Sequence, residues 1–218
     1  MLSLAAVALL WRLHEPERPA APPRHPVLEI KDGAQFVWRQ PFLQPALMTG
    51  VVWNIAWFVL QAAYVPYAVR VLGLSAQMVG ITLGAYGVGM VVGAMLASRL
   101  VGAMRFGRAI QLGPVVSVLA ATSFFLFGVG PIIWTITSTT LRQSLTPEAM
   151  LGRVSSVFLA VNAGSRPIGA ALGGIVGAQW CEAACLWLAL AGFGLQAWLI
   201  VDSSLQRLDV LPGAPTPP

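Results

Sequence analysis

The sequence predicts an all-α integral membrane protein, on three observations. Hydrophobic residues make up 57% of the 218 residues and charged residues only 10%, and the mean hydropathy is +0.75. A soluble domain carries about a quarter charged residues, so a chain this apolar cannot cover a surface that faces water. Apolar runs close to the ~20 residues that a helix needs to cross a bilayer recur along the chain, separated by short charged or Gly/Pro-containing breaks. We therefore expect about five transmembrane helices or helix pieces.

The amino-terminal part precedes these spans. Residues 1–11 are apolar but too short to cross a bilayer, and we expect them to be the end of a truncated helix. Residues 12–44 are the most polar stretch, and their prolines favour an extended cytoplasmic linker. Within this linker, Leu28 to Trp38 can form a short amphipathic helix, with Leu28, Phe36 and Val37 on the membrane surface.

The transmembrane helical bundle is expected over residues 45–201. Breaks are predicted near 69–77, 98–108, 142–153 and 178–182, and residues 202–218 are predicted to be a disordered cytoplasmic tail. Five glycines in the run 78–97 recur at spacings that place several on one helix face. Small residues let helix backbones approach closely in lipid, so we expect an interface there that either slides or packs statically.

Positive charge predicts the orientation of the loops. Lys and Arg concentrate in 12–44, 99–108 and 142–153 and recur in the tail, which the positive-inside rule places in the cytoplasm. The run 109–141 conflicts with this, because its 33 residues fall short of the ~40 that two crossings need. Either the chain crosses twice, with Gly128, Gly130 and Pro131 at the apex, or 109–141 is one long kinked helix that breaks the rule.

Arg166 is the most informative candidate for a substrate cavity. It lies twelve residues from each end of the run 154–178, near the bilayer centre, where a charge is costly and function is the default hypothesis. The alternative is an arginine that bonds the helix backbone freed by Pro167. Asn162 lies four residues earlier, on the same helix face.

A second set of cavity candidates lies in the run 46–68. Asn54, Gln61 and Tyr64 are spaced to share one helix face, with Trp53 and Trp57 beside them. The set is suited to amphipathic aromatic compounds. The alternative is that the aromatic residues anchor the helix at the membrane interface.

Several classes of function are excluded by what the sequence lacks. No Asp or Glu lies inside an apolar run, so the chain has no titratable carboxylate for proton coupling there, and it shows no catalytic set of an enzyme. Cys181 and Cys185 are the only cysteines and have no further ligands nearby, so we expect no metal and no cofactor. The 13 Lys and Arg form no stripe with interleaved aromatics, which argues against nucleic acid. The expected partners are the lipid bilayer and a small-molecule substrate.

Three segments resemble drug and siderophore exporters of the major facilitator superfamily. HPVLEIKDGAQFVWRQPFLQPAL at 25–47 resembles the central cytoplasmic loop and the start of helix seven, and LRQSLTPEAMLGRVSSVF at 141–158 resembles the loop between helices ten and eleven. SRPIGAALGG at 165–174 resembles the glycine-rich middle of helix eleven.

A fourth segment resembles the family's basic gating-loop motif, G-x-L-x-D-R-x-G-R, in its second-half copy. Gly93, Arg99, Gly107 and Arg108 are the matching residues, while Ser98 stands where the stronger version has Asp. The alternative for these arginines is ordinary charge that sets topology.

The resemblance implies the second six-helix half of a major facilitator fold. It implies an efflux antiporter for small amphipathic molecules, in the cytoplasmic (inner) membrane, that works by alternating access. The short run 109–141 then implies an internal deletion of about one helix. We expect the chain to be incomplete alone and to require an amino-terminal half. The alternative is a non-transporting remnant, or an interaction subunit that pairs with a separate amino-terminal half.

Overall fold

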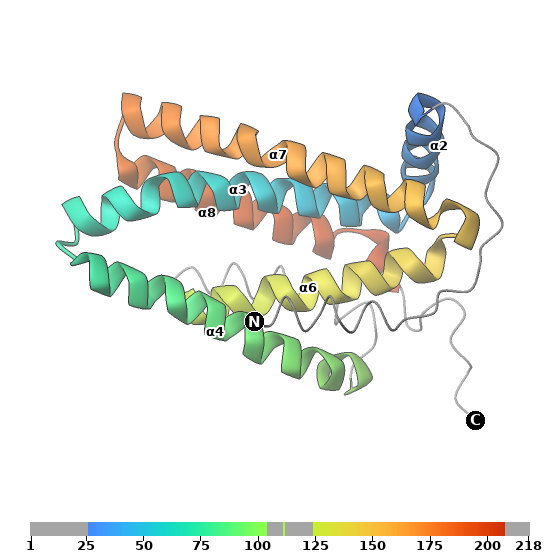
Figure 1. The fold of residues 1–218 in the computed structure, drawn as a ribbon, viewed down its shortest axis with the longest axis horizontal. Coiled ribbons are helices and arrows are strands. Elements are labelled where there is room, and N and C mark those ends of the chain that lie inside the picture. Colours follow the sequence, from blue (N-terminus) through green and yellow to red (C-terminus); the bar gives the residue numbers. More distant parts are fainter. Residues whose placement is uncertain (1–25, 104–110, 112–123, 208–218) are drawn as a thin grey trace, which may run out of the picture.

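The computed structural model describes residues 26–103, 111 and 124–207, and most of these residues are helical (Figure 1). The prediction of an all-α fold is confirmed for this part of the chain. The helices are α2 (Pro26–Arg39), α3 (Leu43–Arg70), α4 (Ala76–Ala103), α6 (Phe124–Leu145), α7 (Leu151–Gln179) and α8 (Glu182–Val201), with the short 3₁₀ helices η2 (Glu148–Met150) and η3 (Ser204–Arg207). The predictions for residues 1–25 and 208–218 lie outside the described residues.

Three of the described helices are long and apolar enough to cross a membrane. They are α3, the first 22 residues of α4, and α8, with mean hydropathies of 1.5, 1.8 and 1.9. The 29 residues of α7 give it a length of about 43 Å, which suffices to cross a bilayer, but its polar residues leave it less hydropathic. The protein is therefore a multi-span membrane protein.

The direction of each helix follows from its contacts at glycines. Gly50 of α3 lies against Asn162 of α7, and Gly173 of α7 lies against Val59 further along α3, so α3 and α7 run parallel. Gly192 of α8 lies against Ala56, while the earlier residue Cys185 packs in one apolar cluster with Ala63, so α8 runs antiparallel to α3.

A second group consists of α4 and α6, which also run parallel. Gly128 of α6 lies against the backbone of Tyr86 and Met90, and Ile132 lies against Gly93. Figure 1 shows this pair below the α3, α7 and α8 group. The predicted double crossing falls largely on residues 104–110 and 112–123, which lie outside the described residues.

The predicted apex of the run 109–141 is wrong. Gly128, Gly130 and Pro131 lie inside α6, which begins at Phe124. The hydroxyl of Thr135 donates to the carbonyl of Pro131, at 2.8 Å, within the same helix. Helix-breaking residues are tolerated where neighbouring helices bury them, and here α4 packs against this part of α6.

Two predicted breaks begin later than expected. α4 continues through Ala103, past the predicted start of the basic loop at 98, and α6 continues to Leu145, past the predicted break at 142. A helix does not stop where its apolar run stops, because long basic side chains extend to the polar interface. The other two predicted breaks are confirmed, at residues 71–75 and at residues 180–181 between α7 and α8. Gly73, at a positive φ of 65°, lies in the first of them, where glycine is common after a helix end.

The close helix contact predicted at the glycines of α4 is confirmed at Gly93, but the described residues make none at Gly80, Gly84 or Gly87. Added Cβ atoms at Gly80, Gly84 and Gly87 would meet nothing within 4 Å in the described structure, whereas one at Gly93 would lie 2.4 Å from Ile132. The described contact with α6 therefore lies in the middle of α4, from Tyr86 to Gly93. Spacing identifies which residues share a face but not which neighbour covers that face.

Candidate functional site

A chain of polar side chains joins the middles of α3 and α7. Nδ2 of Asn54 donates to Oδ1 of Asn162 at 3.1 Å, and Nε of Arg166 donates to Oδ1 of Asn54 at 3.2 Å. Nδ2 of Asn54 also donates to the carbonyl of Gly50, one turn earlier on α3, at 2.9 Å. Nδ2 of Asn162 likewise donates to the carbonyl of Phe158 on α7, at 2.8 Å. These bonds orient both amides, so that Asn54 presents its oxygen to the guanidinium.

Close approach of the two backbones makes this cluster possible. A Cβ at Gly169 would lie 2.5 Å from the carbonyl oxygen of Ile55, and one at Gly50 would lie 2.6 Å from Oδ1 of Asn162. Since lipid provides no hydrophobic drive between helices, association depends on such close packing and on hydrogen bonds across the interface. Gly50 lies one turn before Asn54 on α3. Its close contact with Asn162 was not predicted, although the spacing of four residues places Gly50 and Asn54 on one helix face.

Arg166 lies in the middle of α7 with uncharged partners. Its guanidinium carbon lies 6.0 Å from the centre of the Phe58 ring, a cation–π distance, and the residue is exposed. A guanidinium has five N–H donors, and the hydrogen bonds within the described residues use one of them. The alternative of a bond to the backbone freed by Pro167 is not what the structure shows, because the bond goes to Asn54 of another helix.

The other two predicted cavity residues lie elsewhere. The hydroxyl of Tyr64 is hydrogen-bonded to that of Thr82 in α4, and Tyr64 is buried. Gln61 is exposed, with no hydrogen bond to the cluster among the described residues. Tyr64 also lies ten residues beyond Asn54, about 15 Å along the helix. The three predicted residues therefore form no common cavity. Asn54 contacts α7, Tyr64 contacts α4, and Gln61 is exposed.

An aromatic stack lies beside the polar cluster. The rings of Trp53 and Trp57 are 5.6 Å apart and nearly parallel, and Tyr86 of α4 stacks on Trp57 at 4.9 Å. Among the described residues, the buried indole Nε1 of Trp53 has no hydrogen-bond partner. The pairing of the two tryptophans follows from their spacing, but the contribution of Tyr86 was not predicted because it comes from another helix.

The gating-loop motif is described only in part. Gly93 packs against Ile132 and the backbone of Val129, and Arg99 is exposed near the end of α4. Gly107 and Arg108 lie outside the described residues. Gly93 therefore has a packing role in the structure.

Comparison with known proteins places the chain in a family. Residues 1–170 match the sequence model of the Major Facilitator Superfamily. The enterobactin exporter EntS of Shigella flexneri is 30% identical over 196 residues, which cover 87% of this chain and 47% of that protein. The same exporter of Citrobacter koseri is 30% identical over 192 residues, which cover 81% of this chain and 45% of that protein. The chain thus spans about half the length of these curated relatives. No solved structure matches the chain.

Proposed function

The chain belongs to the major facilitator superfamily, a family of transporters and not of enzymes, and we propose that it forms the carboxy-terminal half of an efflux carrier. In this proposal the carrier works by alternating access in the cytoplasmic membrane, as an antiporter, and the chain acts together with an amino-terminal helical half. Export is supported by the two relatives, both of which are exporters. Substrate sites of such carriers lie near the bilayer midplane, between two helical halves.

We propose that the cluster of Asn54, Asn162 and Arg166 binds an anionic group of a small amphipathic molecule. The observation that carries this proposal is the environment of Arg166, whose described partners are an amide oxygen and an aromatic ring. No acidic side chain forms an ion pair with it in the described part of the chain. Its free donors can therefore bind an anion, since guanidinium forms strong charge-assisted bonds to carboxylates and phosphates. The stack of Trp53, Trp57 and Tyr86 is suited to the aromatic part of such a molecule.

The proposal is tested by export assays on the chain joined to an amino-terminal half. Arg166→Leu should abolish export of amphipathic anions and preserve export of a neutral compound of similar size. Insertion should be unchanged or improved, because an arginine at a helix centre costs about 2.5–3.5 kcal/mol on insertion scales. Arg166→Lys is the matched control that keeps the charge, and it should keep part of the anion export.

Two results would contradict the proposal. Undiminished anion export by Arg166→Leu would show that the arginine has a structural role only. If the chain inserts and binds the amino-terminal half but the pair exports nothing, the chain is an interaction subunit and not part of a carrier.

A further inference from the structure

α2 lies across one end of the bundle and is held there by α7. Figure 1 shows α2 projecting sideways from the long axis of the helices. Gly33 lies so close to α7 that a Cβ would be 2.9 Å from the carbonyl oxygen of Arg153. Val37, one turn later, is 1% exposed and packs with Leu43 and Val154. The bundle therefore fixes both the position of α2 and its rotation about its own axis.

Part of the sequence prediction for α2 is wrong. The helix exists, and Leu28 is exposed, but Val37 is buried in the bundle and Phe36 packs against the same apolar cluster. The apolar residues of α2 thus fall into two groups. Phe36 and Val37 pack against the bundle, while others, such as Leu28, are exposed.

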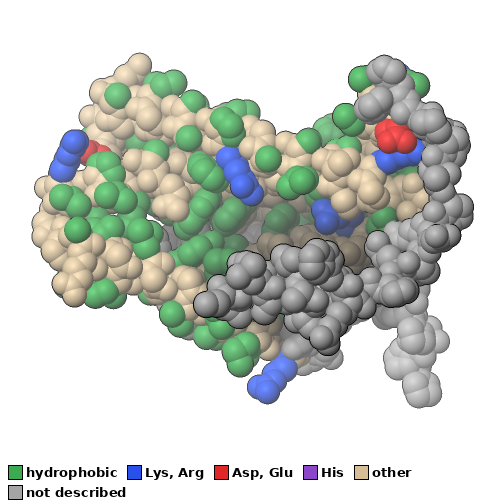
Figure 2. Space-filling view, in the orientation of Figure 1, with side chains coloured by type: hydrophobic (Ala, Val, Ile, Leu, Met, Phe, Trp, Pro, Cys, Tyr) green, Lys and Arg blue, Asp and Glu red, His purple; other side chains and the backbone are tan. Residues whose placement is uncertain are grey.

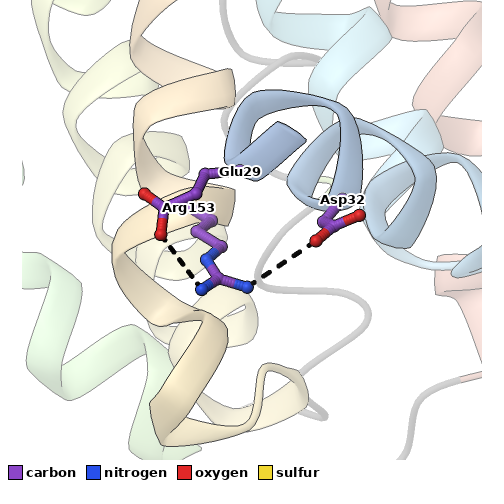
Figure 3. A network of polar contacts seen from close by, with 3 residues as sticks. All are labelled: Glu29, Asp32 and Arg153. Carbon is purple, nitrogen blue, oxygen red and sulfur yellow. Dashed lines mark hydrogen bonds and ion pairs between the residues drawn. The ribbon is translucent and has the colours of Figure 1, made fainter. Parts of the chain in front are cut away.

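The acidic residues of α2 face the same contact with α7. Figure 3 shows Glu29 and Asp32 on either side of the Arg153 guanidinium, which comes from the first turn of α7. The distances are 3.1 Å from Nη2 to Oε1 of Glu29 and 3.8 Å from Nη1 to Oδ2 of Asp32. With both carboxylates paired, Lys31 and Arg39 supply the unpaired charge among the described residues of α2, and both are exposed.

The exposed side of α2 divides into two flanks. At 3.6 residues per turn, Val27, Ile30, Ala34 and Trp38 form one stripe, in which Val27 is 63%, Ile30 57% and Trp38 59% exposed. A second stripe, next to it, contains Lys31, Gln35 and Arg39, and Leu28 is the one large apolar residue on that side. We call the first stripe the apolar flank and the second the basic flank.

We propose that α2 is an interfacial helix that binds the lipid surface. The apolar flank lies at the boundary between headgroups and acyl chains of one leaflet, and Lys31 and Arg39 contact anionic headgroups. Such helices lie in the membrane plane, with the apolar face buried about 5–10 Å into that boundary. Basic residues near the surface attract anionic lipids.

The position of the apolar flank argues for lipid over a protein partner. Figure 2 shows hydrophobic side chains on the flank of α2 that faces back along the bundle, at the upper right of the view. The adjoining part of α7 exposes apolar residues as well, with Leu159 70% exposed. The apolar flank and α7 therefore both expose apolar side chains, as surfaces that face lipid do.

The proposal is tested by spin labels that report depth in the bilayer. The full chain, with Cys181→Ser and Cys185→Ala, is reconstituted into phosphatidylcholine vesicles with or without phosphatidylglycerol. A label at Trp38→Cys should be accessible to oxygen and shielded from a water-soluble nickel chelate, whereas a label at Gln35→Cys should show the reverse. Ala34→Cys reports on the apolar flank with Trp38 intact and should match position 38.

The charge contribution is tested by Lys31→Gln combined with Arg39→Gln. Phosphatidylglycerol should deepen the label at position 34 in the unaltered helix, and this shift should be lost in the double variant. The proposal is overturned if the apolar flank is as accessible to nickel as position 35. It is also overturned if both flanks are shielded from both reagents, as a protein partner would cause. None of these readouts depends on transport, so the result is independent of the proposed function.

Discussion

The two arginines of α7 have opposite surroundings. Arg153, in the first turn, lies between two carboxylates, while Arg166, in the middle, contacts an amide and an aromatic ring. The first turn is held to α2 by ion pairs and by the contact of Gly33, and the middle is held to α3 by close packing at Gly169 and by amide hydrogen bonds.

This difference shows that the end and the middle of one helix are held by different interactions. At the end of the bundle, water competes for charged groups, and exposed ion pairs contribute only about 0–1 kcal/mol. In the middle, tight backbone contact is the main attraction between helices, and an unpaired charge is costly. Among the described residues Arg166 has no acidic partner, which is why we propose that it binds an anionic group of the substrate.

The largest expected effect comes from separating α3 and α7 at the middle. Gly169→Val places side-chain atoms against the backbone of Ile55, where a Cβ already lies at 2.5 Å. Overpacking of this kind costs typically about 1–3 kcal/mol, and we expect the upper part of that range because backbone cannot move aside. Gly164→Val is the control on the same helix, since a Cβ there meets nothing within 4 Å. Unfolding in detergent, followed by circular dichroism, measures both, and equal losses would show that the contact at Gly169 is unimportant.

A smaller effect is expected from making the middle of α7 resemble its first turn. Asn54→Asp gives Arg166 a carboxylate in place of an amide oxygen, so the guanidinium becomes paired as Arg153 is. Export of amphipathic anions by the chain with an amino-terminal half should fall about tenfold, equivalent to about 1.4 kcal/mol, and export of neutral compounds should remain.

Asn54→Ala separates charge pairing from loss of the hydrogen bond. It removes the bond to Arg166 without adding a charge, so it should reduce anion export less than Asn54→Asp. If both variants export anions equally well, the charge of Arg166 is not what recognises the substrate.

The smallest effect is expected at the first turn of α7. Glu29→Gln removes the 3.1 Å ion pair with Arg153 and should destabilise the contact by at most about 1 kcal/mol, because both side chains are partly exposed to solvent. Asp32→Asn should cost less, since its oxygen lies 3.8 Å away. Thermal unfolding at low and high salt measures the loss, which salt should diminish. Glu148→Gln, on an exposed acid of η2, is the control, and a loss as large there would mean that the pair with Arg153 contributes nothing.

Sequence reasoning identified part of the candidate site. Asn162 and Arg166 are four residues apart on one helix, so their common face follows from helix geometry alone. Asn54 was found as a polar residue within an apolar run, but its bond to Arg166 joins residues 112 positions apart. Gln61 and Tyr64 show the limit of that reasoning. They are three residues apart on one helix, yet Gln61 is exposed and Tyr64 is hydrogen-bonded to Thr82 of α4.

The sequence by itself determined the all-helical class and the residues whose polarity is unusual for lipid, because composition and apolar period are properties of each segment alone. Only the tertiary structure decided that α4 and α6 run parallel, that Gly169 and not Gly164 meets a backbone, and that Val37 faces the bundle while Trp38 does not. The physical reason is that a helix surface has several faces of similar composition. Which face is covered depends on close contacts with helices that are distant in the sequence, and no local pattern records those contacts.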